Sequence, residues 1–193
     1  MRILLLLLIT LLGSNSLYAQ NADQQIKDLL ESRDDQIKEL MGPEGTEYTD
    51  DQRAELKTII NGIINFEAMA KEALDETYNT ISEEQRNEFV DLFSTIVRDQ
   101  SLNKLDIYRA KVTYTNISAN GNEARVETLA ELDDVRTPVN YEMTNKEGEW
   151  VITDMEIDDV STAGSYHRQF QRIINQKGFD SLMNSLRKRA DRA

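Results

Sequence analysis

Few side chains in this sequence combine the type and the spacing that chemistry at a protein site requires. His167 is the only histidine and the chain has no cysteine, so no His–His or His–Cys ligand set is available. The next candidates are three aspartate pairs, Asp34–Asp35, Asp133–Asp134 and Asp158–Asp159. None of these pairs stands in the alternating ligand spacing with a central glycine that a calcium loop requires. The pattern favours solvated turns and predicts no metal site.

Motifs for nucleophilic catalysis and phosphate binding are missing as well. Ser94, Ser101 and Ser161 lack the glycine pattern of a nucleophile elbow, and the sequence contains no glycine-rich phosphate loop. Carboxylates alone do not single out an acid–base pair, because the chain has 35 of them. The sequence therefore predicts a protein that is not an enzyme and needs no cofactor.

The length and the net charge of the chain limit the classes of protein to which it can belong. The 193 residues carry a formal net charge of −13, and 39% of them are hydrophobic, which suits a globular chain with one core. An acidic surface repels nucleic acid unless a basic patch intervenes, so we expect no nucleic-acid partner. The basic patch is Arg187–Arg189 with Arg192, and cations there most simply complement the C-terminal end of a helix.

The first twenty residues have the composition of an export signal. Arg2 supplies a positive charge, the apolar run Ile3 to Leu12 follows, and Ala19 is a small residue at the exit. The alternative is an uncleaved membrane anchor, which needs about 20 apolar residues, roughly twice the length of this run. We expect a signal peptide over residues 1–20, cleaved on export, and a single domain over residues 21–193.

Helical periodicity extends from residue 23 to about residue 105. Thr49 and Ser82 are each followed three positions later by glutamine, which is the capping-box pattern at the start of a helix. Asn65 is a suitable cap for another helix between them. Two more helices are expected near the C-terminus, on either side of Gly178.

Alternation with a period of two replaces the helical pattern between residues 111 and 157. Asn120–Gly121 and Glu147–Gly148 are hairpin signals within this stretch. Four strands are expected, over about 112–116, 124–132, 139–143 and 150–157. Short turns between them predict an antiparallel meander.

This order of elements predicts an α+β fold in which about six to seven helices pack on one face of a four-stranded antiparallel meander. The helices outnumber what so small a sheet needs as cover. They therefore either close a solid core or enclose an apolar cavity, and the hydrophobic pattern alone does not separate these two arrangements.

The order of several short motifs carries a resemblance to a known family. The motifs are Tyr141 in a strand, Gly148–Trp150 followed by Asp154, Val160–Ser161, the helix Tyr166–Phe170, and Gly178 with Leu182. A second segment agrees with them, namely Asn65–Phe66 followed by Gln85, Phe89 and Phe93. Together they resemble the MlaC family, also called the toluene-tolerance family, of periplasmic phospholipid-binding proteins. The resemblance covers roughly residues 25 to 190.

The resemblance implies a monomeric carrier whose transported ligand is phospholipid. Such a carrier exchanges lipid with an inner-membrane ABC-type transporter complex and an outer-membrane lipoprotein–porin complex, and so serves outer-membrane lipid asymmetry. A diacyl lipid has about thirty methylenes, and at about 0.8 kcal/mol each their exposure to water costs well over about 20 kcal/mol. A carrier must therefore enclose the tails in an apolar cavity.

The residues expected to contact the tails are apolar side chains that face between helices and sheet. They are Phe66, Met69, Phe89, Phe93, Val97, Tyr141, Met143, Trp150, Ile152, Tyr166, Phe170 and Ile174. Each of them is equally compatible with a purely structural place in a core. Arg168 matches the family's arginine, and either a lipid phosphate or an ion pair within the protein would account for it.

The chain also departs from the family pattern. Leu74–Asp75 and Tyr78 replace a Leu-Gly pair and a tryptophan, and residues 162–165 are smaller and more polar than the family's segment. These departures concern the pocket mouth and the partner surface more than the fold. Two other functions stay open: a ligand-free periplasmic adaptor domain with a solid core, and a carrier of another apolar lipid.

Overall fold

The computed structural model describes the backbone of residues 4–102 and 105–192, and the side chains from residue 21 on except that of Asp106. Within these ranges the chain forms seven α-helices, one 3-10 helix and five strands. The helices are α1 (Leu4–Met41), α2 (Asp50–Asn61), α3 (Phe66–Leu74), α4 (Glu76–Thr80), α5 (Glu83–Leu102), η1 (Leu105–Arg109), α6 (Thr162–Lys177) and α7 (Phe179–Ala190). The strands are β1 (Lys111–Asn120), β2 (Glu123–Leu132), β3 (Val135–Lys146), β4 (Glu149–Ile157) and β5 (Val160–Ser161).

The predicted helix starts are confirmed at atomic level. The Thr49 hydroxyl accepts the Gln52 backbone N–H at 3.2 Å, and the Gln52 side chain accepts the Thr49 N–H at 3.0 Å. Ser82 and Gln85 form the same reciprocal pair before α5, and Asn65 Oδ1 accepts an N–H of the first turn of α3. These bonds satisfy donors that a helix start leaves without partners. No pattern in the sequence predicted α4 or η1, which are five residues each.

The sheet has the order β1-β2-β3-β4-β5 and is antiparallel throughout. It contains five strands rather than the four that were predicted. Asp158 and Asp159 form a two-residue turn with φ of 52° and 61°, and this turn brings Val160–Ser161 back onto the end of β4. Aspartate tolerates positive φ better than most residues, and such turns match the twist of a hairpin. A strand of two residues is too short to produce an alternating pattern in the sequence.

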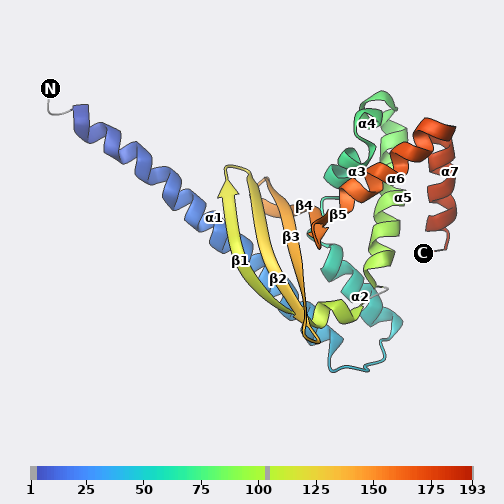
Figure 1. The fold of residues 1–193 in the computed structure, drawn as a ribbon, viewed down its shortest axis with the longest axis horizontal. Coiled ribbons are helices and arrows are strands. Elements are labelled where there is room, and N and C mark those ends of the chain that lie inside the picture. The colour runs from blue at the N-terminus through green and yellow to red at the C-terminus, as the bar shows by residue number, and fades with distance from the viewer. Residues whose placement is uncertain (1–3, 103–104, 193) are drawn as a thin grey trace.

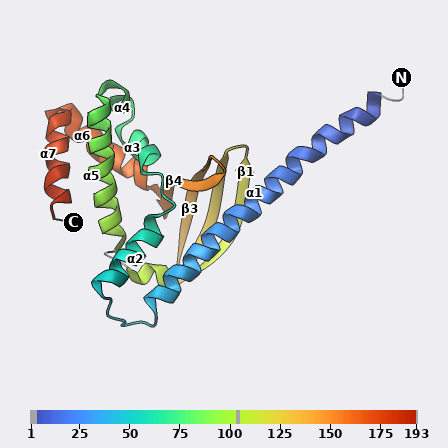
Figure 2. The same ribbon diagram turned by 180° about the vertical axis from the view of Figure 1, so that it is seen from behind.

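Helix α1 crosses one face of the sheet, as Figures 1 and 2 show from opposite sides. Its Ile26 and Leu30 pack against Val126 and other inward side chains of the central strands. Asp23 Oδ1 accepts the backbone N–H of Ala119 at 2.9 Å, which ties the helix to β1. Buried and partly exposed positions alternate along β2 and β4, because α1 covers one face of the sheet.

The other large helices lie beside the sheet rather than over it. Helices α3, α5, α6 and α7 pack on one another and contact the sheet mainly along β4 and β5 (Figure 1). The expectation that all helices pack on one face was therefore wrong. The apolar stripes of these four amphipathic helices face each other, so the sheet is not needed to bury them. Helix α2 joins the two parts at the base, where Leu56 packs with Ile37 and Met41 of α1.

The predicted signal peptide enters the structure only in part. From residue 4 its backbone forms the first part of α1, whereas residues 1–3 and the side chains up to residue 20 lie outside the described part of the chain. Its cleavage, and a mature domain over residues 21–193, stay predictions. Among the helices that the structure describes, none is both long enough and apolar enough to cross a membrane.

Candidate functional site

Eleven of the twelve residues expected to contact lipid tails belong to, or pack against, one of two hydrophobic clusters. The helical cluster consists of Met69, Ala70, Ala73, Leu74, Phe89, Phe93, Ile96, Ala163, Phe170, Leu182, Met183 and Leu186. The sheet cluster consists of Ile26, Leu30, Ile63, Ala124, Val126, Met143, Trp150 and Ile152. Ile64, between α2 and α3, packs against both clusters and joins them.

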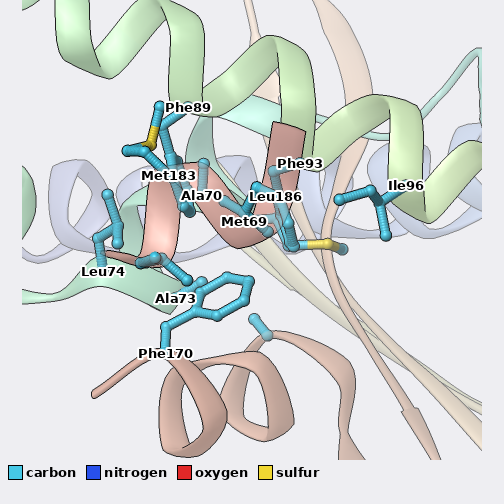
Figure 3. Close-up of a cluster of buried hydrophobic side chains, with 12 residues drawn as sticks. Met69, Ala70, Ala73, Leu74, Phe89, Phe93, Ile96, Phe170, Met183 and Leu186 are labelled. Carbon is cyan, nitrogen blue, oxygen red and sulfur yellow. The ribbon is translucent and has the colours of Figure 1, made fainter. Parts of the chain in front are cut away.

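Seven of the twelve belong to the helical cluster or pack against it. Phe89 and Phe93 stack with ring centroids 5.7 Å apart, and Phe170 meets both rings edge-on at 5.6 and 5.9 Å. These three side chains are at most 1% exposed. Figure 3 shows Phe170 facing Ala73 and the side chains above it, while Met183 and Leu186 close the cluster beside α5. The rings therefore already make aromatic contacts of the favoured geometry with one another.

The remaining members of the helical group lie at its margins. Tyr166 meets Phe93 edge-on at 4.9 Å, and its hydroxyl donates to Gln100 at 2.7 Å. Val97 and Ile174 are partly buried against the cluster. Phe66 belongs to neither cluster, and the guanidinium of Arg98 lies 4.6 Å from its ring centroid, a cation–π contact.

Four of the twelve line the sheet side. Met143 lies directly opposite Ile152 across β3 and β4, and Tyr141 lies opposite Val126 across β2 and β3. Trp150 is two positions before Ile152 in β4, and all four side chains face α1 or pack at the edge of its contact. The structure thus brings Met143, Trp150 and Ile152 together, as the alternating pattern predicted.

The indole of Trp150 has an unsatisfied polar atom. The side chain is 6% exposed, and its buried Nε1 has no hydrogen-bond partner among the described residues. An indole N–H is a donor only, so it needs an acceptor. Leaving a buried donor without one costs about 1–3 kcal/mol. The sheet cluster therefore contains a buried donor that lacks an acceptor, whereas the phenylalanine rings of the helical cluster have no polar atom that needs a partner.

Two tyrosines border the sheet cluster next to an acidic hollow. Burial raises the pKa of Tyr141 to about 12, and burial followed by the neighbouring Tyr141 raises the pKa of Tyr114. Both phenols are therefore neutral at ordinary pH. A hollow of about 300 Å³ lies between α1 and β1, lined by Glu31, Asp34, Asp35, Val112 and Tyr114. Its carboxylates make this hollow unsuitable for acyl chains, because burying a charge against apolar groups is costly.

Strand β4 connects the two clusters. The N–H of Ile152 donates to the Ile63 carbonyl at 2.7 Å, and the N–H of Asn65 donates to the Ile152 carbonyl at 2.8 Å. Further along β4, Asp154 accepts the Ser161 hydroxyl at 2.5 Å and the Ala163 N–H at 2.9 Å. Asp154 thereby holds the first turn of α6 to the sheet.

Sequence reasoning did not find these connecting residues. The aspartate that follows Gly148–Trp150 was a motif position without a role, and Ile64 belongs to no motif. The available signal was the acidic residue itself, because an aspartate in an otherwise apolar strand requires donors nearby. No pattern in the sequence marks Ile64 as a joint.

Arg168 lies on the exposed side of α6, away from both clusters. Its guanidinium donates to the Ser165 hydroxyl at 3.0 Å. The sequence offered a lipid phosphate or an ion pair as its partner. Within the described residues its hydrogen bond goes to the hydroxyl of a neighbour on the same helix, so the structure does not bring Arg168 to the twelve apolar residues.

The ionisable groups nearest to β4 do not form a reactive set. Burial, and then the charge of Asp154, raises the pKa of Glu72, while His167 acts to lower it. Ser161, the serine next to this group, donates to a carboxylate rather than to a histidine. Over the residues that the structure describes, no group of three or more His, Asp or Glu side chains is placed to hold a metal ion.

Two of three comparisons with known proteins find a match, one to a family model and one to a solved structure of similar fold. A family model described as MlaC protein matches residues 20–188. The fold is similar to a solved structure, the phospholipid-binding protein from Ralstonia solanacearum in complex with a phospholipid, with a TM-score of 0.73 and 17% sequence identity. The match covers 89% of this chain and 97% of that chain. A search of curated proteins finds no match. At this level of identity the structural likeness shows the fold alone.

Proposed function

This chain belongs to the MlaC family, and on that premise we propose that it is a periplasmic carrier that encloses the tails of a phospholipid. The family match over residues 20–188 is the observation that carries the proposal. The Ralstonia protein of the same fold, which was solved with a phospholipid bound, supports it. The predicted signal peptide over residues 1–20 agrees with a periplasmic location.

We expect the tails to lie between the sheet cluster and the helical cluster. Ile64 packs against both clusters, so displacing its side chain would expose apolar side chains of both clusters to one cavity. Each methylene moved from water into such a cavity contributes about 0.8 kcal/mol, so a long tail can offset the loss of protein–protein contacts there. Met143, Trp150, Ile152 and Tyr141 are the tail contacts we expect first, because the helical rings are already engaged with each other.

The unsatisfied indole of Trp150 favours a ligand that brings oxygen atoms. A phospholipid carries ester carbonyls where its tails join the glycerol, and these groups are hydrogen-bond acceptors. An ester carbonyl beside Trp150 would give the buried N–H its partner and place the polar headgroup toward solvent. A purely hydrocarbon ligand would leave the same donor without a partner.

To transport the lipid that it binds, the carrier needs an exchange partner at each of the two membranes. We propose an inner-membrane ABC-type transporter complex and an outer-membrane lipoprotein–porin complex as the two exchange partners, since the family works between them. The carrier itself then needs no ATP site, because the free energy of transport comes from the partners. Its contribution to outer-membrane lipid asymmetry is the removal of exposed methylenes from water during transit.

Mass spectrometry of the lipid extracted from the exported protein, purified without detergent, tests this function. We expect phospholipid in about equimolar amount. The control is the same protein stripped of lipid and incubated with phospholipid vesicles, which should restore the bound lipid. A folded protein that holds no phospholipid and takes none from vesicles would contradict the proposal and support the ligand-free adaptor. Extraction of another apolar lipid in its place would support the second alternative.

A further inference from the structure

Charge is distributed very unevenly along this acidic chain. Residues 162–193 contain seven Lys and Arg against two Asp and Glu, whereas residues 1–161 contain fifteen against thirty-three. The basic stretch coincides with α6 and α7 and the residues after them. In Figures 1 and 2 this helical hairpin lies at the opposite end of the molecule from the start of α1. This hairpin, the α6–α7 pole, is therefore the basic segment of an otherwise acidic chain, and it packs beside α3 and α5, whose stretch 66–102 contains three Lys and Arg against nine Asp and Glu.

Most of these cations form no ion pair or side-chain hydrogen bond with the described residues. Arg187 forms a two-pronged ion pair with Glu88, at 2.6 and 2.8 Å. By contrast, four exposed cations make no ion pair or side-chain hydrogen bond with any described residue, namely Arg172, Lys177, Lys188 and Arg192. The C-terminal end of α7 accounts for cations in its last turn, but Arg172 lies in the middle of α6.

The spacing of these residues opposes helix stability. Lys188 lies in the last turn of α7 and Arg192 two residues beyond its end, whereas Arg168 and Arg172 are four residues apart on α6. Like charges at this spacing lie one turn apart on the same side of a helix and destabilise it. Phe170 and Leu186, which are buried, point away from them into the helical cluster. An anionic surface beside the helix would attract both cations and so offset the repulsion between them.

We propose that the outward faces of α6 and α7 form an electrostatic docking surface for an anionic phospholipid bilayer. The proposal rests on the function proposed above, because a carrier must reach the surface that supplies or receives its lipid. Cations near an anionic bilayer are attracted within about a Debye length, which is about 10 Å at 0.1 M salt. The acidic remainder of the molecule is repelled, so the protein binds with the α6–α7 pole toward the lipid.

A bilayer fits this surface better than an acidic protein does. Protein interfaces usually have an apolar centre with large side chains as anchors. The exposed large hydrophobic residues that the structure describes are Ile107, Val135, Ile157 and Val160, and none of them lies on α6 or α7. Electrostatic association with lipid phosphates requires no apolar anchor, and it is reversible, as a carrier that must leave again requires.

Vesicle co-sedimentation at low salt tests the surface. The wild-type chain is compared on vesicles of phosphatidylcholine alone and on vesicles with equal parts of phosphatidylglycerol. The test variant carries Arg172→Glu and Lys188→Glu. The matched control carries Lys111→Glu and Lys146→Glu, which make the same change in net charge at exposed ends of β1 and β3.

We expect the wild type to bind only the vesicles with phosphatidylglycerol and to dissociate as salt is raised. The test variant should bind about tenfold or more weakly, because two cations are lost and two anions are gained at the surface. The control should bind within about twofold of the wild type. Equal loss in both variants would overturn the proposal, since net charge alone would then explain binding. Absence of wild-type binding at low salt would also overturn it and leave an acidic protein as the partner for this pole.

The lipid content of each variant separates this proposal from the proposed function. If the carrier function holds, phospholipid extracted from the test variant should equal that of the wild type, because Arg172 and Lys188 contact neither cluster. Loss of vesicle binding with retained lipid supports the docking surface. A chain that contains no lipid in any variant contradicts the carrier function, whatever its binding to vesicles.

Discussion

The helical cluster and the sheet cluster have similar hydrophobic composition, but they differ in whether their buried hydrogen-bond donors have acceptors. In the helical cluster, Phe89, Phe93 and Phe170 are fully buried and contact one another at 5.6 to 5.9 Å. In the sheet cluster, Trp150 is buried with an indole N–H that lacks an acceptor. The first arrangement is complete without a ligand. The second would be completed by a ligand that carries oxygen.

From this difference we infer that the helical cluster mainly stabilises the fold and that the sheet cluster mainly binds the ligand. Close-packed aromatic rings contribute mainly to the free energy of unfolding. An unsatisfied buried donor lowers that free energy and is retained where it serves binding. Substitutions in the two regions should separate the two roles.

Removal of a ring from the helical cluster should have the largest effect. Phe93→Ala is expected to lower the free energy of unfolding by about 3–5 kcal/mol, because a fully buried ring is replaced by a cavity. Urea denaturation of the lipid-free protein measures this change. Ile107→Ala is the control, since that side chain is 48% exposed and should change stability by less than about 0.5 kcal/mol. A small effect of Phe93→Ala would show that the cluster is not a structural core.

Loss of the connection between the regions should have the next largest effect. Asp154→Ala leaves the Ser161 hydroxyl and the Ala163 N–H without their acceptor and should lower the free energy of unfolding by about 2 kcal/mol. Asp154→Asn keeps an acceptor oxygen and should restore part of the loss. The same urea titrations measure both variants. Unchanged stability of Asp154→Ala relative to the wild type would mean that Asp154 does not hold α6 to β4.

Replacement of the indole tests the sheet cluster as a ligand site. Trp150→Phe keeps an aromatic ring but removes the N–H, so retention of a diester phospholipid should fall by about fivefold, which corresponds to a hydrogen bond of about 1 kcal/mol. A diether analogue lacks the carbonyls and should bind both proteins equally well. Competition between the two lipids, read by mass spectrometry, measures the difference. The volume-conserving Met143→Leu should leave the preference for the diester unchanged. If wild type does not prefer the diester, Trp150 has another role.

The smallest effect concerns a carboxyl group beside β4. Burial and Asp154 raise the pKa of Glu72 above its ordinary value of 4.5, so the folded state favours the protonated form. Its favourable contribution is present below the unfolded-state pKa and is lost as the pH rises through the folded-state pKa. Glu72→Gln should therefore raise the free energy of unfolding at neutral pH by no more than about 0.5 kcal/mol, because the group is largely solvated. Urea titrations well below the ordinary pKa should show no difference, and a difference that persisted there would contradict the explanation.

The sequence predicts those parts of the structure that depend on local chemistry. Thr49 and Ser82 predict their helix starts because a cap is made within four residues. The hairpin signals, the helices other than α4 and the family resemblance were also predicted correctly. The placement of helices beside the sheet was not, because an apolar stripe does not specify which apolar surface will cover it.

The candidate site shows the same limit. The alternating pattern correctly placed Met143, Trp150 and Ile152 on one face of the sheet. It did not separate them from Phe89 and Phe93, because a cavity wall and a solid core contain the same residue types. The unsatisfied Nε1 of Trp150 depends on the three-dimensional absence of an acceptor among the described residues, which no single sequence records.

Photo-crosslinking with a phospholipid that carries a diazirine on an acyl chain tests the central claim most directly. The labelled lipid is loaded from vesicles, activated, and located in the protein by peptide mass spectrometry. We predict crosslinks in β3 and β4, around Met143 and Trp150, and around Ile64, which packs against both clusters. Crosslinks confined to α5 and α7, or none in a folded protein that has been offered the lipid, would contradict a phospholipid site at the sheet cluster.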